Sequence, residues 1–199
     1  MKIRVGHLYP LELNLYGENG NIKALKYELE KENIEVEIIN INKEDNIEFT
    51  QFDLLYIGSG RKDLLDKVKE RLNPYKNELL KYISNNNILL ATGNSICIFD
   101  FLNLYNIEYY ETRKVADVTA TTSLCNGVIK GFQNTEYLIK STNGIMFNID
   151  SGYGNNETLM EGYKENNFYA TSIIGPILAR NDNLNKYFVE LLKENKKDE

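Results

Sequence analysis

Short apolar segments alternate with stretches of helical periodicity over the first half of the chain. Runs of aliphatic and aromatic residues that are bounded by charged or turn-forming residues are typical of strands buried in a sheet. On this basis the sequence predicts strands over Ile3–Tyr9, Ile34–Ile41, Asp53–Ile57 and Ile88–Ala91.

The segments between these strands carry apolar residues at three- and four-residue intervals, which places them on one face of a helix. Helices are therefore predicted from Gly20-Asn21 through Ile22, Leu25 and Leu29, over Leu64–Leu72, onward to about Tyr82, and over Ile96–Leu104. Asn73-Pro74 interrupts the second stripe, because a proline disfavours the helical conformation of the residue before it. The alternation predicts an α/β fold with a central, mostly parallel sheet and flanking helices.

After about Ile107 the pattern changes to short runs that are broken by polar residues and joined by Asn/Gly turns. These predict a mixed or antiparallel part with strands over Val115–Thr121, Gly127–Phe132, Tyr137–Ile139, Ile145–Ile149 and Phe168–Ile173. A closing helix is marked by Leu184, Phe188, Leu191 and Leu192. We expect a single domain over residues 1–192 and a charged, disordered tail over residues 193–199.

Composition and charge exclude some classes of partner. The chain has 199 residues and a net charge of −6, with an isoelectric point near 5.1. That balance argues against nucleic acid and anionic membranes as partners, because it supplies no excess of cations to neutralise phosphates. No apolar run approaches the roughly 20 residues needed to cross a bilayer, and no signal sequence is recognisable. We expect a cytoplasmic protein without membrane insertion.

Cysteine and histidine are scarce. Cys97 and Cys125 are too few for a disulfide framework, and a single histidine disfavours a zinc site of the usual kind. His7 lies inside an apolar strand and is interpreted as a structural, hydrogen-bonded core residue. The expectation is chemistry without a metal or cofactor.

Two strand ends carry the candidate chemistry, since sites in open α/β sheets lie beyond the carboxyl ends of the strands. Thr92-Gly93-Asn94-Ser95 follows one strand and precedes a helix, which is the arrangement that presents a nucleophile beside backbone amides. Gly58-Ser59-Gly60 follows another strand, where glycines let the backbone approach a substrate. The alternative is that both are ordinary tight turns.

Five blocks in colinear order resemble a known family. They are His7-Leu8-Tyr9-Pro10, Leu13–Gly17 with Gly20-Asn21, Ile57–Gly60, Gly152–Asn156 and Gly175–Leu178. The chain resembles the cobyric-acid-synthase-like class I glutamine amidotransferases, most closely their GatD-type subunits. The resemblance implies a fold of that class and a cysteine nucleophile with a histidine base. It also implies ammonia transfer to a Mur-ligase-like partner (MurT), which uses ATP to amidate the D-glutamate carboxylate of a peptidoglycan precursor.

The catalytic positions of that family are substituted here. Thr92 stands at the position of the nucleophilic cysteine, and Ile174 stands at the position of the histidine before Gly-Pro. Cys97 lies five residues past the nucleophile position, inside the predicted helix. Loss of a nucleophile and its base costs several orders of magnitude in rate, so the chain is predicted to lack Cys/His glutaminase activity.

Other parts of the family site are retained. Gly58-Ser59-Gly60 and Gly93 stand at the oxyanion positions, and Arg113 matches an arginine that the family uses to hold glutamine. Arg113 can equally be a solvated charge beside Lys114.

Three hypotheses remain open. The first is a degenerate subunit that docks on a Mur-ligase-like partner as scaffold or regulator. The second is a weakly active amidotransferase that uses Thr92 and takes ammonia from glutamine, with a base from a partner chain. The third is an amino-acid-binding module that grips a carboxylate with Arg113 and the amides of residues 58–60.

Overall fold

A six-stranded, mostly parallel sheet forms the centre of the computed structural model, which describes residues 1–141 and 143–197. Its order within those residues is β2-β1-β3-β4-β10-β9, and β9 alone runs antiparallel to its neighbour. The strands are β1 (Lys2–Leu8), β2 (Glu35–Ile41), β3 (Leu54–Ile57), β4 (Ile88–Thr92), β9 (Tyr163–Glu165) and β10 (Phe168–Thr171).

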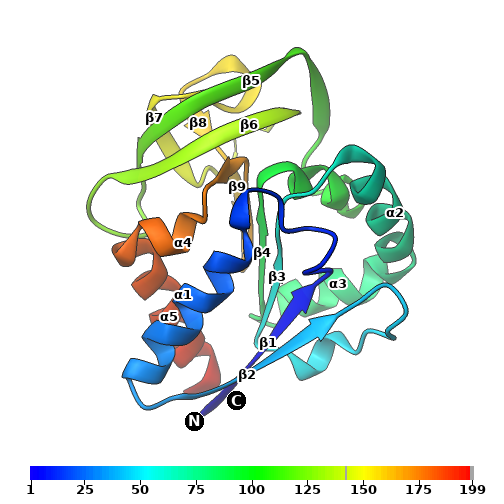
Figure 1. Ribbon diagram of the computed structural model, residues 1–199, viewed down its shortest axis with the longest axis vertical. Helices are drawn as coiled ribbons and strands as arrows, with labels where there is room; N and C mark the ends of the chain where they lie inside the picture. Colours follow the sequence, from blue (N-terminus) through cyan, green and yellow to red (C-terminus); the bar gives the residue numbers. More distant parts are fainter. Residues whose placement is uncertain (142, 198–199) are drawn as a thin grey trace.

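Helices cover both faces of this sheet (Figure 1). On one face lie α1 (Asn19–Lys31), α4 (Ile177–Arg180) and α5 (Asp182–Lys197), and on the other lie α2 (Lys62–Leu72) and α3 (Lys76–Ser84). The predicted stripe of α1 is buried, and Leu65, Val68 and Leu72 of α2 are buried in the opposite core. The predicted α/β class is confirmed by this arrangement.

A second sheet lies across the carboxyl end of the first (Figure 1). Its order is β11-β6-β5-β7-β8 and every pair in it is antiparallel. The strands are β5 (Ile107–Thr121), β6 (Ile129–Ile139), β7 (Phe147–Ser151), β8 (Met160–Glu161) and β11 (Ile173–Ile174). Because β10 and β11 are consecutive in the chain but belong to different sheets, the segment Phe168–Ile174 joins the two layers.

Several predicted boundaries are wrong. The segment expected as one strand over Phe168–Ile173 divides between the two sheets, whereas the runs Gly127–Phe132 and Tyr137–Ile139 merge into the single strand β6. The segment expected as an α-helix over Ile96–Leu104 is a 3₁₀ helix, Gly93–Leu102. Of the expected tail, residues 193–197 belong to α5, which continues to Lys197, and residues 198–199 lie outside the described residues.

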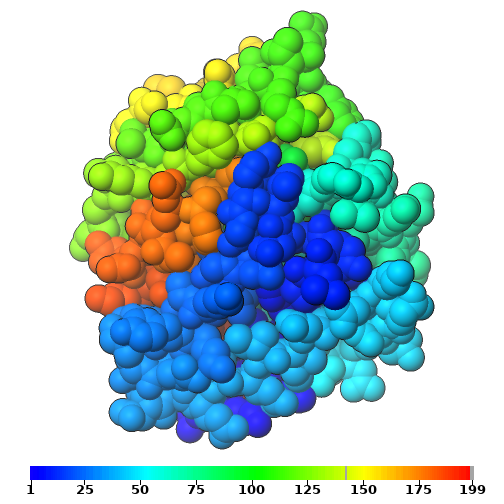
Figure 2. Space-filling model, in the orientation of Figure 1, coloured from blue at the N-terminus to red at the C-terminus, as the bar shows by residue number. Residues whose placement is uncertain are grey.

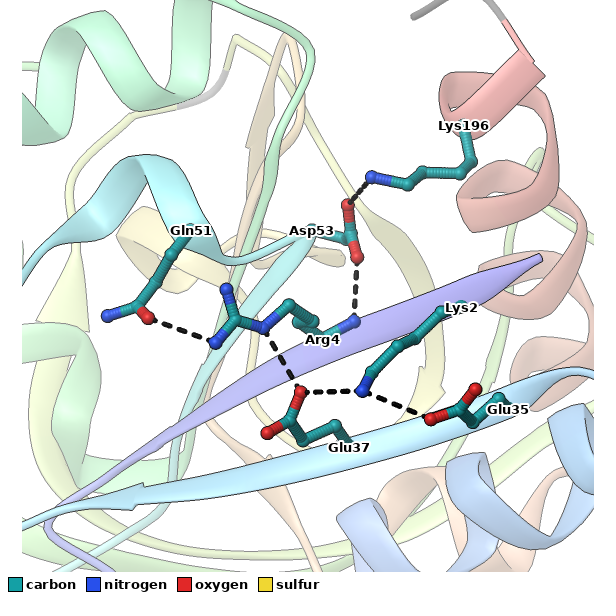
Figure 3. Close-up of polar contacts among 7 residues, drawn as sticks. All are labelled: Lys2, Arg4, Glu35, Glu37, Gln51, Asp53 and Lys196. Atoms are coloured by element: carbon teal, nitrogen blue, oxygen red, sulfur yellow. Dashed lines mark hydrogen bonds and ion pairs between the residues drawn. The ribbon is translucent and has the colours of Figure 1, made fainter.

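The tail is helical because it carries contacts of its own. Lys196 of α5 forms an ion pair with Asp53 (3.0 Å), and the other oxygen of Asp53 accepts the backbone N–H of Arg4 at 2.7 Å (Figure 3). Arg4 also pairs with Glu37 at 3.2 Å. The last turn of α5 is thereby fixed to the start of β3, at the amino end of the first sheet. None of the helices in the described part of the chain is long and apolar enough to span a membrane.

Candidate functional site

Thr92 ends β4 in an ordinary extended conformation, and the left-handed residue of the turn is the next one. Thr92 has φ −122° and ψ 147°, whereas Gly93 has φ +64°. A nucleophile elbow places its strain on the nucleophile itself, so that the side chain projects into the site. Here the left-handed conformation falls on a glycine one residue later, where it causes no strain, and the Thr92 side chain is fully buried.

The Thr92 hydroxyl belongs to a buried polar cluster with Glu18, Tyr56 and Asn21. It donates a short hydrogen bond to Glu18 Oε2 and shares a second with the Tyr56 hydroxyl at 2.9 Å. Tyr56 also donates to Glu18 Oε2 (3.1 Å) and accepts from Asn21 Nδ2 (2.7 Å). All four residues have no exposed surface, so every bond of the hydroxyl is made inside the protein.

Glu18 is the one charged group in this cluster. Burial raises the pKa of its carboxyl to about 7, and the hydrogen bonds from Thr92, the Gly175 backbone and Tyr56 only partly oppose that shift. Its second oxygen accepts the N–H of Gly175 at 3.3 Å, directly after the position of the family's histidine. Glu18 therefore bridges the turn after β4 and the turn after β11.

Hydrogen bonds tie the turn after β4 to the turn after β3, where the oxyanion positions were predicted. The N–H of Asn94 donates to Ser59 Oγ at 3.1 Å, and the Ser59 carbonyl accepts the N–H of Leu15 at 2.9 Å. A Cβ on Gly60 would lie 2.3 Å from Leu13 Cδ2, because the segment before α1 packs directly on this turn. The predicted oxyanion turns therefore lie side by side and are packed against the segment before α1.

The position of the family's base is filled by an alkyl group. Ile174 is buried, and a Cβ on Gly93 would lie 2.5 Å from its Cγ2. The turn after β4 and the end of β11 therefore meet, as the resemblance implies, but the residue there can neither accept nor release a proton.

His7 cannot replace that base. It lies in β1, its ring is 5.3 Å from that of Tyr56, and burial lowers its pKa to about 4. The expectation of a buried core residue agrees with the structure. The expected hydrogen bond is not found at Nε2, which has no partner in the described part of the chain.

Arg113 binds a carboxylate of its own chain. Its Nε and Nη2 both donate to Glu136 Oε1, at 3.1 and 2.9 Å, and Nη1 donates to Asn134 Oδ1 at 3.2 Å. The structure shows no contact of Arg113 with Thr92 or with the turn at residues 58–60. The group that resembles a substrate-carboxylate anchor is thus already occupied by Glu136 on β6.

Glu18, Tyr56 and Asn21 were not identified from the sequence. Glu18 stands in a polar, glycine-containing turn that is typical of a helix start, and its partner Thr92 is 74 residues away. A tyrosine in the otherwise aliphatic strand β3 was the one available signal, since a buried phenol needs a polar partner.

The described cavities lie away from this cluster. The two that border the middle of β5 have volumes of about 330 and 290 Å³ and are lined by Tyr110, Lys114 and Glu157. In Figure 2 the dark-blue N-terminal segment lies at the centre of the visible face, beside the orange C-terminal segment. Among residues 1–141 and 143–197, no three His, Cys, Asp or Glu side chains are placed to hold a metal ion.

We expect Cys97 to be unreactive. It is buried in the 3₁₀ helix, and burial raises the pKa of its thiol to about 12, whereas Cys125 is partly exposed. A thiol reagent at pH 8 should therefore modify Cys125 first and Cys97 at the rate of unfolding, because only the thiolate reacts. Mass spectrometry after timed alkylation measures both sites. Equal labelling of the two cysteines in the folded protein would contradict this.

Comparison with known proteins agrees with the resemblance seen in the motifs. The chain is 28% identical to the GatD subunit of the glutamine-hydrolysing lipid II isoglutaminyl synthase of Staphylococcus aureus, over 98% of this chain and 86% of the relative. It is 25% identical to the corresponding GatD subunit of Streptococcus pneumoniae, over 92% and 77% respectively. No family model matches the chain.

The fold is that of solved glutamine amidotransferases. A glutamine amidotransferase from Thermotoga maritima superimposes with a TM-score of 0.61 over 98% of this chain and 84% of that one, at 9% identity. The class I amidotransferase-like architecture is therefore confirmed.

Proposed function

We propose that this chain is a GatD-type subunit that has lost glutamine hydrolysis and acts as a non-catalytic scaffold or regulator of a partner enzyme. The observation that carries the proposal is the hydrogen bond from the Thr92 hydroxyl to the buried Glu18 carboxyl, opposite Ile174 in place of a histidine. The nucleophile position is thus held by the protein itself, and the base is absent.

Thr92 and Glu18 are hydrogen-bonded as a nucleophile is to its base, but nucleophilic attack by this threonine is unfavourable. A threonine hydroxyl is far less acidic than a thiol and needs a base within hydrogen-bond reach. The pKa of about 7 gives the Glu18 carboxyl the strength of a general base, but neither Thr92 nor Glu18 has exposed surface, so a substrate does not reach the hydroxyl. These features support a silent site over a weak threonine-dependent enzyme.

The names of the relatives support a partner enzyme. Both GatD proteins are named as subunits of a lipid II isoglutaminyl synthase, which supports a Mur-ligase-like partner of the MurT type in amidation of a peptidoglycan precursor, in the cytoplasm. The burial of Thr92 and the presence of Ile174 at the histidine position support a structural or regulatory role for this chain in that assembly. An amino-acid ligand is less well supported, because Arg113 is already paired with Glu136.

Glutamate release from glutamine tests this proposal. We expect the purified chain, alone or with a Mur-ligase-like partner, to release glutamate no faster than its Thr92→Ala variant, within the error of a coupled assay. Thr50→Ala, the same change at an exposed position, is the matched control for handling and folding. Release that disappears in Thr92→Ala but persists in the control would show that the site is active and that the proposal is wrong.

A further inference from the structure

The strand β5 has an unusually long free edge. It is 15 residues long, yet within the described residues it pairs with β7 only at Thr119–Thr121. Its pairing with β6 is interrupted between Tyr109 and Lys114, where four residues of β5 oppose one of β6. Along residues 107–118 the backbone N–H and C=O groups on the β7 side therefore have no strand partner. Figure 1 shows β5 along the top of the molecule, with β7 beside one end of it.

This edge is exposed, and it is flanked by hollows. None of the residues from Ile107 to Asp117 is buried, and Tyr109 and Val115 are 59% and 52% exposed. The cavities of about 330 and 290 Å³ lie beside its middle, at Tyr110 and Lys114. An open edge with adjacent pockets is the arrangement that accepts an added strand, with backbone bonds supplying affinity and pockets supplying specificity.

The charges along β5 are ordered so that the strand complements itself. Glu108 and Glu111 precede Thr112, and Arg113 and Lys114 follow it. Antiparallel alignment of two copies about Thr112 places Glu111 opposite Arg113 twice, once on each side of the twofold axis. The same alignment puts Tyr110 opposite Lys114, Tyr109 opposite Val115 and Glu108 opposite Ala116, so that no like charges face each other over these positions.

Two side chains next to Thr112 could contact a second copy of β5 in this alignment. Arg113 uses Nε, Nη1 and one Nη2 hydrogen for β6, and further donors of the guanidinium remain for a second carboxylate. Lys114 lies 5.0 Å from the ring centroid of Tyr110 and 5.2 Å from that of Tyr153, so a further tyrosine opposite it would extend an existing cation–π contact.

We propose that two copies of this chain associate through antiparallel pairing of β5 about Thr112, which joins their second sheets into one. The interface is isologous, because each copy presents the same segment to the other. This association is independent of whether the Thr92 site is active.

Charge reversal at the centre tests the proposal in sedimentation velocity over a concentration series. We expect the wild-type chain to show a reversible monomer–dimer equilibrium. Glu111→Arg places arginines opposite each other, and Arg113→Glu does the same with glutamates, so each variant alone should dimerise at least about tenfold more weakly. The matched control is Lys130→Glu, a charge reversal at an exposed position of β6.

Mixing the two variants separates this pairing from a folding defect. A Glu111→Arg chain and an Arg113→Glu chain are complementary to each other, so their equimolar mixture should form a heterodimer while neither forms a homodimer. The proposal is wrong if the wild-type chain stays monomeric at every concentration, if Glu111→Arg dimerises like the wild type, or if the mixture gives no heterodimer. A strand supplied only by a different protein would appear as the first of these outcomes.

Discussion

Glu18→Ala is expected to destabilise the fold by about 3–5 kcal/mol, because it leaves a cavity and removes the acceptor for several buried donors. The Thr92 hydroxyl, the Tyr56 hydroxyl and the Gly175 N–H all donate to this carboxyl. Each buried donor without a partner costs about 1–3 kcal/mol. Urea unfolding followed by circular dichroism measures the loss as a lower midpoint.

Glu18→Gln is the matched control, since it keeps the volume and one carbonyl oxygen while the hydroxyls of Thr92 and Tyr56 can rotate to accept from its amide. We expect it to remain within about 1 kcal/mol of the wild type at pH 7. If Glu18→Ala were as stable as Glu18→Gln, the carboxyl would not be the centre of this cluster.

Stability is expected to fall as the pH rises from about 4.5 to about 7. Burial raises the pKa values of Glu18 and Glu161 to about 7 in the folded protein, so the native state binds more protons than the unfolded state over this range. Each carboxyl then costs about 3 kcal/mol above pH 7, at about 1.4 kcal/mol per pKa unit. His7 acts in the opposite direction between pH 6.5 and about 4, where unfolding takes up a proton. The two carboxyls outweigh it.

Urea midpoints at pH 5, 6, 7 and 8 measure this trend. Glu161 is the cleaner group for the variant, because it accepts bonds only from Thr171 and Ser172 and lies outside the Thr92 cluster. Glu161→Gln should therefore flatten the decline, and Glu44→Gln, the same change at an exposed position, should leave its slope unchanged. A midpoint that rises from pH 6 to pH 8 in the wild type would contradict the expectation.

The local pattern of apolar and polar residues predicted most strands of the first sheet. It did not predict how the strands of the second sheet pair with one another. The strands β1 to β4 and the helix α1 follow from apolar runs and helical spacing, which reflect burial on one or both faces. The segment Gly93–Leu102 is buried almost throughout and therefore has no polar face to reveal its helix type. The division of Phe168–Ile174 between two sheets depends on distant partners, Leu89–Thr92 for one part and Phe132 and Gln133 for the other.

The candidate site, too, was predicted only in part. The resemblance in the motifs placed Thr92 at the position of the family's nucleophile and Ile174 at the position of its base. The turns that carry these two residues do meet in the structure. What holds the site closed is contributed by Glu18 and Ser59, through bonds that span 74 and 35 residues of sequence. Hydrogen bonds between residues so far apart in the sequence cannot be predicted from the local pattern. The same residues could equally stand in a turn that is open to solvent.

The ion pair between Lys196 and Asp53 has a consequence for how quickly the molecule assembles. It closes a loop of 143 residues, and the carboxyl at its centre also holds the backbone of Arg4 (Figure 3). The cost of closing a loop grows with its length, and contacts of large sequence separation slow folding. A residue in the last turn of α5 therefore helps to hold the first strand, and we expect docking of α5 to come late in folding.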